Sequence, residues 1–308
     1  MKIDVIIPTY KPDKGFIELL DMLFSQSVIP DRVIIANTEK SYWDSFVQKY
    51  PDNKCLDKVE VFHVLKSQFD HGKTRNEAMK RSDADICIVM TMDAIPANEK
   101  MIENLIKPLS DDMIAVSYAR QLAYENSSLT EKLTRQFNYP DRSQIKTADD
   151  IEKLQIKAFF CSNVCCAYDK KIFDELDGFV NKTLFNEDMI YASKVLKNGY
   201  KISYSADACV YHSHEYSGIQ QFKRNFDNGV SHAQYPEVFG SVKQNAEGMK
   251  MVRSVLKSLV KKAHFLSAFV YIWHTACKYL GFKLGCSYTS LPKGMVKRFT
   301  TNSEYFNS

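Results

Sequence analysis

Residues 185–189, Phe-Asn-Glu-Asp-Met, place two neighbouring carboxylates at the start of an amphipathic pattern. Asp93 directly follows an earlier apolar run, and His212 and His214 occur further along the chain. A carboxylate can act as a general base, and carboxylate and imidazole groups can hold a divalent cation. Together these groups can deprotonate a hydroxyl and stabilise a diphosphate leaving group. The combination indicates group transfer rather than a binding module.

Asp93 is the first candidate metal ligand. A lone Asp after a strand is as often a turn residue as a ligand. As a ligand it would bind a hard cation such as Mg²⁺ or Mn²⁺, with nucleotide phosphates completing the shell. One carboxylate alone is a weak site, so His212 and His214 are the expected partners. Residues i and i+2 of a strand share a face, which would point both rings the same way. A surface histidine pair beside an aromatic turn is the alternative.

Glu187 and Asp188 also have an explanation that needs no catalysis. Acidic residues in the first turn of a helix complement its macrodipole, and Asn186 is a good N-cap. The helical pattern then ends at Asn198-Gly199, which is typical of a C-terminal end. From the residues alone, the structural role is slightly favoured over the catalytic one.

Residues 71–76, His-Gly-Lys-Thr-Arg-Asn, open a helix that the pattern extends to about Arg81. Glycine beside basic residues at a helix start suits phosphate contact through amides, dipole and guanidinium. This short motif favours Gly72 and Arg75 as phosphate contacts.

The elements that must position these residues alternate between strands and helices. The pattern predicts strands at 5–7, 32–37, 59–64 and 86–91, with helices at 16–23 and 71–81. Such alternation predicts βαβ units and a mainly parallel sheet. Ligands bind beyond the carboxyl ends of these strands. Four groups should therefore converge on one rim: Thr9-Tyr10, Asn37, Asp70–Asn76 and Asp93. Residues 140–157 read as a polar loop that covers the site, followed by a strand at 158–160.

Composition is ordinary for a soluble globular protein. The 308 residues, 45% hydrophobic and 25% charged, suit one large domain or one domain with an appendage. Eight cysteines are thinly spread with no CxxC pair, which favours free thiols in a reducing cytosol. The chain enters its first strand directly after Met1-Lys2, so no secretory signal is expected.

Charge is distributed unevenly along the chain. Residues 241–308 hold eleven Lys and Arg against two acids, a net +9, while the first 240 residues hold thirty against thirty-five, a net −5. Basic and apolar residues alternate within 250–285, whose apolar run is too short to span a bilayer. A basic amphipathic helix with Trp and Phe suits an anionic membrane surface. The alternatives are a helix packed on the domain with a solvated basic face, and a nucleic-acid partner that would bind salt-sensitively.

Taken in order, the motifs resemble those of family 2 glycosyltransferases with the GT-A fold. They are most similar to the bacterial rhamnosyltransferase branch that builds surface polysaccharides. The resemblance covers residues 1–235 and rests on segments 5–10, 69–76, 91–94, 118–121, 137–140, 160–165, 186–188 and 211–214. Segment 69–76 resembles the branch's FDHGxTRN signature, and 91–94 corresponds to its TQDA metal motif. Met92 stands where the branch usually has Gln, a departure that removes a polar contact and bears on donor preference.

The resemblance implies an α/β GT-A (Rossmann-like) fold over residues 1–235, with a mainly parallel sheet flanked by helices. A basic, helical C-terminal region follows at 236–308. It implies that Asp188 is the general base of an inverting displacement, supported by Glu187. It implies that Asp93, with His212 or His214, holds a Mg²⁺ or Mn²⁺ ion bridging the diphosphate. The expected nucleotide-sugar contacts are Pro8, Thr9, Tyr10, Asn37, Asp70, Gly72, Arg75, Met92 and Asp93.

We therefore expect a cytoplasmic glycosyltransferase, peripheral at the inner face of the cytoplasmic membrane through residues 250–285. It would move rhamnose from dTDP-rhamnose onto a lipid-linked saccharide, with no nucleic-acid partner. The alternatives are a UDP-hexose-dependent enzyme of the same fold and a non-catalytic GT-A-like binding protein. Intact Asp93 and Asp188 speak against the last.

Overall fold

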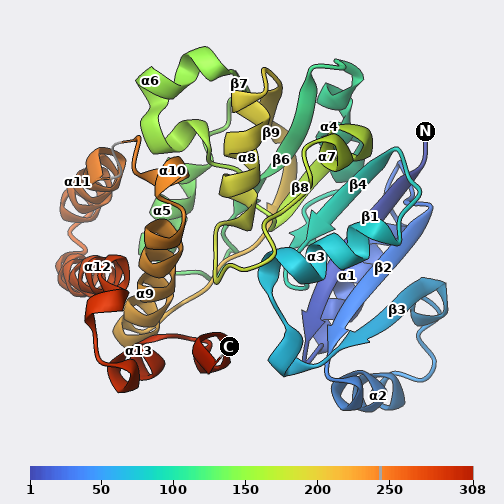
Figure 1. Cartoon of the computed structure of the whole chain (residues 1–308), viewed down its shortest axis with the longest axis horizontal. Helices are drawn as coiled ribbons and strands as arrows, with labels where there is room; N and C mark the ends of the chain where they lie inside the picture. The colour runs from blue at the N-terminus through green and yellow to red at the C-terminus, as the bar shows by residue number, and fades with distance from the viewer. Residues whose placement is uncertain (243–244, 308) are drawn as a thin grey trace.

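A nine-stranded sheet in the order β3-β2-β1-β4-β8-β6-β9-β5, with β7 also paired to β9, organises the chain (Figure 1). The computed structural model describes residues 1–242 and 245–307, so residues 243, 244 and 308 of the predicted C-terminal region lie outside it. The strands are β1 Ile3–Tyr10, β2 Arg32–Thr38, β3 Val59–Val64, β4 Ile86–Met90, β5 Ile95–Pro96, β6 Ile114–Leu122, β7 Gln144–Lys146, β8 Cys165–Asp169 and β9 Lys201–Tyr211.

The helices cover both faces and one side of this sheet (Figure 1). They are α1 Lys14–Phe24, α2 Lys40–Lys49, α3 His71–Lys80, α4 Met101–Ile106, α5 Leu129–Asn138, α6 Ile151–Leu154, α7 Lys170–Glu175, α8 Glu187–Lys197, α9 Gly218–Gln234, α10 Pro236–Phe239, α11 Asn245–Lys261, α12 Phe265–Cys286 and α13 Lys293–Phe299.

The strands predicted in the first ninety residues are confirmed as β1 to β4. β1 pairs in parallel with β2 and β4, and β2 pairs in parallel with β3. All five residues of β4 are buried, as expected for a parallel strand covered on both faces. Side chains alternate between two core layers, with Ile6 and Val89 in one and Ile7 and Ile88 in the other. This half is the parallel α/β layer that the sequence predicts.

Beyond β4 the sheet is mixed. β8 pairs antiparallel with both β4 and β6, β9 runs parallel to β6, and β5 pairs antiparallel with β9. The α/β class is confirmed, while the second half of the sheet combines parallel and antiparallel pairs. The short β5 has a consequence for the site because its Ile95 pairs with Tyr211 at the end of β9.

The predictions for residues 140–160 are wrong in two respects. Residues 140–157 contain strand β7 and helix α6 rather than only loop, and residues 158–160 are not a strand. Ala158 and Phe159 are buried in the core, but they lie at the end of a 3₁₀ turn over Gln155–Ala158, and the strand begins at Cys165. A short apolar run has no periodicity that separates a buried loop from a strand.

The C-terminal helices form a layer beside the sheet, in which α12 packs along α9, and α11 lies beside α12 (Figure 1). α9 and α12 run in the same direction, since Gly218 lies against Trp273 and Gly285 lies against Phe226. A Cβ added at Gly281 would lie 2.2 Å from the Phe222 carbonyl oxygen, so this glycine permits close contact of the two backbones. The division at residue 235 falls between α9 and α10 and stays a prediction.

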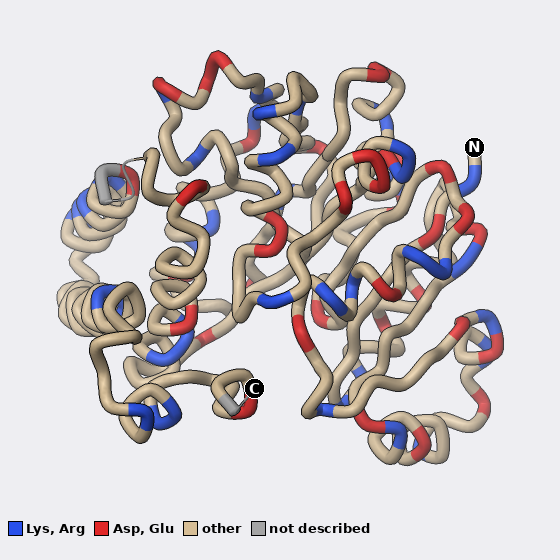
Figure 2. Tube along the Cα trace, viewed as in Figure 1, with Lys and Arg blue, Asp and Glu red and all other residues tan. Residues whose placement is uncertain are grey.

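Lys and Arg are the more frequent charged residues on this layer (Figure 2). Over residues 1–242 and 245–307, we find no helix with both the length and the apolar character needed to cross a bilayer.

Candidate active site

Asp93, His212 and His214 come together at the end of β4 and β9. Each offers one ligand atom, and the three atoms lie within 4.8 Å of one another. The Nε2 atom of His214 is 3.1 Å from one Asp93 carboxylate oxygen, and that of His212 is 3.6 Å from the other. The pairing of Ile95 with Tyr211 explains this arrangement, since Asp93 precedes β5 and the histidines follow β9. One carboxylate and two imidazoles thus form a candidate cation site, here called the Asp–His–His triad.

The sequence predicted that His212 and His214 lie on a strand. They lie beyond it, because β9 ends at Tyr211. The two rings nevertheless lie edge to face, with 3.0 Å between their Nε2 atoms.

Gln121 fixes the orientation of the His212 ring. Arg135 donates to the Gln121 side-chain oxygen, so that oxygen is an acceptor. The same oxygen lies 3.1 Å from His212 Nδ1, which must then carry the proton and leave the Nε2 lone pair facing Asp93. The Gln121 amide nitrogen donates to Tyr139 and Ser162. Segment 118–121 was noted in the sequence, but no role was given to Gln121.

The charge states of the triad suit a cation. Burial lowers the pKa of His212 to about 3, so this imidazole is neutral near pH 7. Burial opposes ionisation of Asp93, but the hydrogen bond from His214 and nearby partners hold its pKa well below the usual range. Because His212 is neutral, we ascribe this ionisation to hydrogen bonding more than to an ion pair. A neutral imidazole and an ionised carboxylate are the forms that bind metals.

Glu187 is a buried carboxylate with three partners. It is 5% exposed, lies 3.2 Å from the Arg75 guanidinium and accepts a 2.9 Å hydrogen bond from the Asn163 side-chain amide. Burial opposes its ionisation, but the charge of Arg75, together with the interactions with His71 and Asn163, lowers the pKa of Glu187 below its usual value. Glu187 is therefore ionised near pH 7.

Asp188 has the opposite electrostatic environment, although it is the next residue. It accepts hydrogen bonds from the backbone amides of Asn163, at 3.0 Å, and Met189, at 2.8 Å. Burial and the negative charge of Glu187 raise the pKa of Asp188 to about 7. Two neighbouring carboxylates whose pKa values are driven apart are typical of acid–base sites. Asp188 alone of the pair can exchange a proton near neutral pH.

The sequence predicted that the Asn186 side chain caps α8, and this prediction is wrong. It adopts a left-handed conformation with φ of 67° and makes no side-chain capping bond. Its amide instead donates to the Asn228 side-chain oxygen of α9 at 2.6 Å. Helix α8 thus begins at a residue tied to the C-terminal helical layer.

The expected rim residues of β1 and β2 do lie together. Thr9 and Asn37 are partners in the parallel register, and the Thr9 hydroxyl donates to the Asn37 side-chain oxygen at 3.1 Å. The Tyr10 amide lies 3.5 Å from the Met92 sulfur, so Met92 adjoins the same rim. Pro8 precedes them in β1 beside Ala36. Their contacts with a nucleotide sugar stay predictions.

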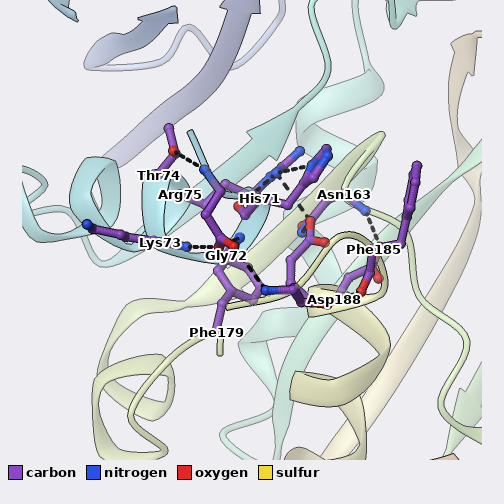
Figure 3. Close-up of polar contacts among 12 residues, drawn as sticks. His71, Gly72, Lys73, Thr74, Arg75, Asn163, Phe179, Phe185 and Asp188 are labelled. Carbon is purple, nitrogen blue, oxygen red and sulfur yellow. Dashed lines mark hydrogen bonds and ion pairs between the residues drawn. The ribbon is translucent and has the colours of Figure 1, made fainter. Parts of the chain in front are cut away.

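Residues of α3 lie on the inner side of the site. Figure 3 shows the first turn of α3, carrying His71 to Arg75, beside the segment that carries Phe185 and Asp188. Asp70 caps this helix by accepting from the amides of Gly72 and Lys73. A Cβ on Gly72 would lie 1.8 Å from the Val180 carbonyl oxygen. Phosphate contact by Asp70, Gly72 and Arg75 stays a prediction, and their inward positions do not favour it.

Arg224 of α9 is a further candidate that sequence reasoning missed. Its guanidinium carbon lies 5.2 Å from the Phe185 ring centre and 4.7 Å from that of Tyr216. Tyr216 in turn packs against His214, and Phe185 stacks on His71. No carboxylate lies within ion-pairing distance of Arg224 in the described part of the chain. The positively charged guanidinium of Arg224 therefore lies between the Asp–His–His triad and the Glu187–Asp188 pair.

Comparison with known proteins gives consistent results. A family model described as glycosyl transferase family 2 matches residues 4–177. The chain is 38% identical to the O-antigen chain rhamnosyltransferase RfbN of Salmonella typhimurium, over 100% of this chain and 97% of that protein. It is 33% identical to the O-antigen chain rhamnosyltransferase WbaN of Salmonella anatum, over 99% and 95% of the two chains.

Solved structures share the fold at low sequence identity. A mannosyltransferase from Pyrobaculum calidifontis, in complex with GDP-Man and Mn²⁺, superposes with a TM-score of 0.53 at 14% identity, covering 99% of this chain and 84% of that one. S. aureus TarS 1-349 in complex with UDP-GlcNAc gives a TM-score of 0.53 at 16% identity, covering 97% and 84%.

Proposed function

The chain belongs to glycosyltransferase family 2, and from this we propose that it moves rhamnose from dTDP-rhamnose onto a saccharide acceptor, with inversion at the anomeric carbon. Two relatives that align over nearly the whole chain are named O-antigen chain rhamnosyltransferases. The single observation that carries the catalytic part is the pairing of the Asp–His–His triad with an Asp188 whose pKa is about 7.

In this reaction Asp188 takes the proton from the acceptor hydroxyl. The hydroxyl oxygen forms a bond to the anomeric carbon as the bond from that carbon to the diphosphate oxygen breaks. The electron pair of the broken bond stays on the nucleoside diphosphate. A base with a pKa near the working pH is well suited to this transfer. Glu187 stays ionised and, through Asn163, helps to hold the segment whose amide binds Asp188.

The donor set of the triad fits a divalent cation. An anionic oxygen and two neutral imidazoles suit Mn²⁺ better than Mg²⁺, because Mg²⁺ prefers oxygen ligands. When bound, such an ion would supply a positive charge to the diphosphate. Asp93, His212 and His214 would hold it, Gln121 would keep the His212 ring in place, and the Arg224 guanidinium would lie on the side of the carboxylate pair.

A UDP-hexose is the alternative donor, since Met92 adjoins Tyr10 where the resembling branch has Gln. The purified protein would be screened by thermal shift and by transfer against a panel of nucleotide sugars, with and without Mn²⁺. Stabilisation by dTDP-rhamnose above UDP-glucose and UDP-galactose supports the proposal. Stabilisation by UDP-sugars alone would favour the UDP-hexose alternative. No response to any nucleotide sugar would contradict both donor assignments.

The C-terminal helices support peripheral binding to an anionic membrane, on the cytoplasmic side and next to a lipid-linked acceptor. α12 exposes apolar side chains at helical spacing, with Phe265, Phe269 and Trp273 exposed by 65%, 72% and 61%. Exposed lysines lie in the last turns of α11 and directly after it, close before these residues: Lys257, Lys261 and Lys262. Aromatic residues beside lysines match the chemistry of an anionic lipid surface.

A further inference from the structure

Two cavities lie along the contact between α9 and α12 and border the catalytic groups described above. The first, of about 270 Å³, is bounded by Gln221 and His274 and reaches His214. The second, of about 470 Å³, is bounded by Asn225 and Phe282. Tyr271 and Lys278 line both cavities. We call the two cavities together the seam groove.

Helical geometry explains why polar side chains line the α9 side of both cavities. Its α9 wall consists of Gln221, Asn225, Asn228 and His232, spaced four, three and four residues apart, so they share one helix face. Glycines at the contact bring the backbones of α9 and α12 together, as at Gly281 and Gly285. The groove therefore has a close-packed floor and one polar wall.

The side chains of the groove suit a saccharide. Amides of Gln221, Asn225 and Asn228 can each donate and accept, as neighbouring sugar hydroxyls require. The Asn225 amide nitrogen donates to the Gln221 backbone carbonyl at 2.8 Å, which leaves its side-chain oxygen able to accept a hydrogen bond from a sugar hydroxyl. On the α12 side, Tyr271, Tyr279 and Phe282 supply apolar surface against which the C–H face of a sugar ring can pack. The second cavity is within the size range of small-molecule sites, about 300–1,000 Å³.

Lys278 is the charged residue that the two cavities share. Within the residues that the structure describes, no carboxylate lies at ion-pairing distance from its ammonium group, and burial lowers its pKa. An ammonium group donates hydrogen bonds and accepts none. Oxygen atoms of a bound molecule would satisfy it.

The groove also meets the catalytic groups at two places. Asn186 and Met189, which flank Glu187 and Asp188, line the second cavity. His214 of the triad lines the first. A saccharide lying in the groove would thus lie beside the residues that flank the base and beside His214 of the triad.

We propose that the seam groove binds the saccharide acceptor, through the Asn225 amide on one wall and the Lys278 ammonium on the other. This inference rests on the proposed glycosyl transfer and adds the location and the contacts of the acceptor. The acceptor and the donor then enter from opposite sides, since the donor rim lies at the ends of β1 and β2.

The test uses Asn225→Ala and Lys278→Ala in the full chain, each with a matched control. Asn198→Ala removes an exposed asparagine that makes the same bond to the carbonyl four residues before it, at 2.8 Å. Lys80→Ala removes an exposed lysine of α3. Steady-state transfer gives the KM for the acceptor, and thermal shift with the nucleotide sugar alone reports donor binding.

We expect the KM for the acceptor to rise about tenfold in each groove variant, the usual effect of one lost hydrogen bond to a ligand. Donor binding should stay within about twofold, and both controls should match the wild type. Unchanged acceptor KM in both groove variants, with transfer intact, would overturn the inference and leave the proposed function standing. A wild-type chain that binds no nucleotide sugar would overturn the proposed function, and the inference with it. The two variants lie on different helices, so misfolding of one leaves the other to decide.

Discussion

Arg75 of α3 and Glu187 of α8 form a buried ion pair, with 3.2 Å between Nη1 and Oε1 and both side chains 6% exposed. Glu187 keeps its negative charge because of this partner, and that charge raises the pKa of the neighbouring Asp188. The Arg75–Glu187 ion pair therefore connects helix α3 to the protonation of Asp188, the candidate base.

Glu187→Gln removes that negative charge. The folded-state pKa of Asp188, about 7 in the wild type, should fall, because the carboxylate next to it is gone while Arg75 and its positive charge remain. The base would then be ionised at lower pH, so the acidic limb of the kcat/KM profile should move to lower pH. A profile of kcat/KM against pH for both proteins measures the displacement. An unchanged acidic limb would contradict the electrostatic role of Glu187.

The same substitution should also reduce stability. It leaves the Arg75 charge buried without its partner, which typically costs about 3–5 kcal/mol. Glu77→Gln is the matched control on α3, because Glu77 forms a half-exposed pair with Arg81 at 3.5 Å and such pairs contribute about 0–1 kcal/mol. Urea unfolding of both variants gives the two values.

The parts of the site that lie at strand ends were predictable, and the parts on α9 were not. Asp93, Thr9 and Asn37 follow or end apolar strands, and a parallel sheet brings such positions together. Arg224 and Asn225 lie within a helix, where any polar residue looks like an ordinary solvent-exposed one.

Other features depended on tertiary context. The sequence predicted that Asn186 caps α8, since asparagine is a common cap, but its left-handed backbone and its bond to Asn228 come from packing against α9. The sequence also predicted a strand at 158–160, where the structure has a buried turn. Apolar composition indicates that a segment is buried, but it does not determine the backbone conformation.

Gln121→Leu should weaken Mn²⁺ binding without removing a ligand. Gln121 holds His212 through Nδ1, and loss of such a partner typically lowers metal affinity about 10–100-fold. Isothermal titration with Mn²⁺ measures the change, with the exposed Gln144→Leu as the control. Equal affinities for Mn²⁺ in the wild type and Gln121→Leu would contradict the role of Gln121 in holding His212 as a metal ligand.

Gly281→Ala should destabilise the contact of α9 with α12. The new Cβ would lie 2.2 Å from the Phe222 carbonyl oxygen, and overpacking of this kind costs about 1–3 kcal/mol. Gly294→Ala, in α13 with no atom within 4 Å of the added Cβ, should be neutral or stabilising by up to about 1 kcal/mol. Thermal unfolding compares the two, and equal midpoints would contradict the close packing.

Binding to lipid vesicles should depend on both anionic lipid and the exposed face of α12. Phe269→Glu with Trp273→Glu removes two exposed aromatic groups and adds negative charge, so sedimentation with phosphatidylglycerol vesicles should fall several-fold. Neutral phosphatidylcholine vesicles should bind weakly in every case. The exposed Ile29→Glu, on the far half of the chain, is the control. Undiminished sedimentation of the double variant would exclude this face as the membrane contact.

The most direct test of the account is rhamnosyl transfer by Asp188→Asn. Asparagine keeps the shape of the side chain but cannot take up the proton of the acceptor hydroxyl. The account predicts that the variant binds dTDP-rhamnose and Mn²⁺ as the wild type does and loses transfer by about 10²–10⁴-fold, the usual contribution of a general base. Transfer at the wild-type rate by a correctly folded Asp188→Asn would contradict the assignment of Asp188 as the base.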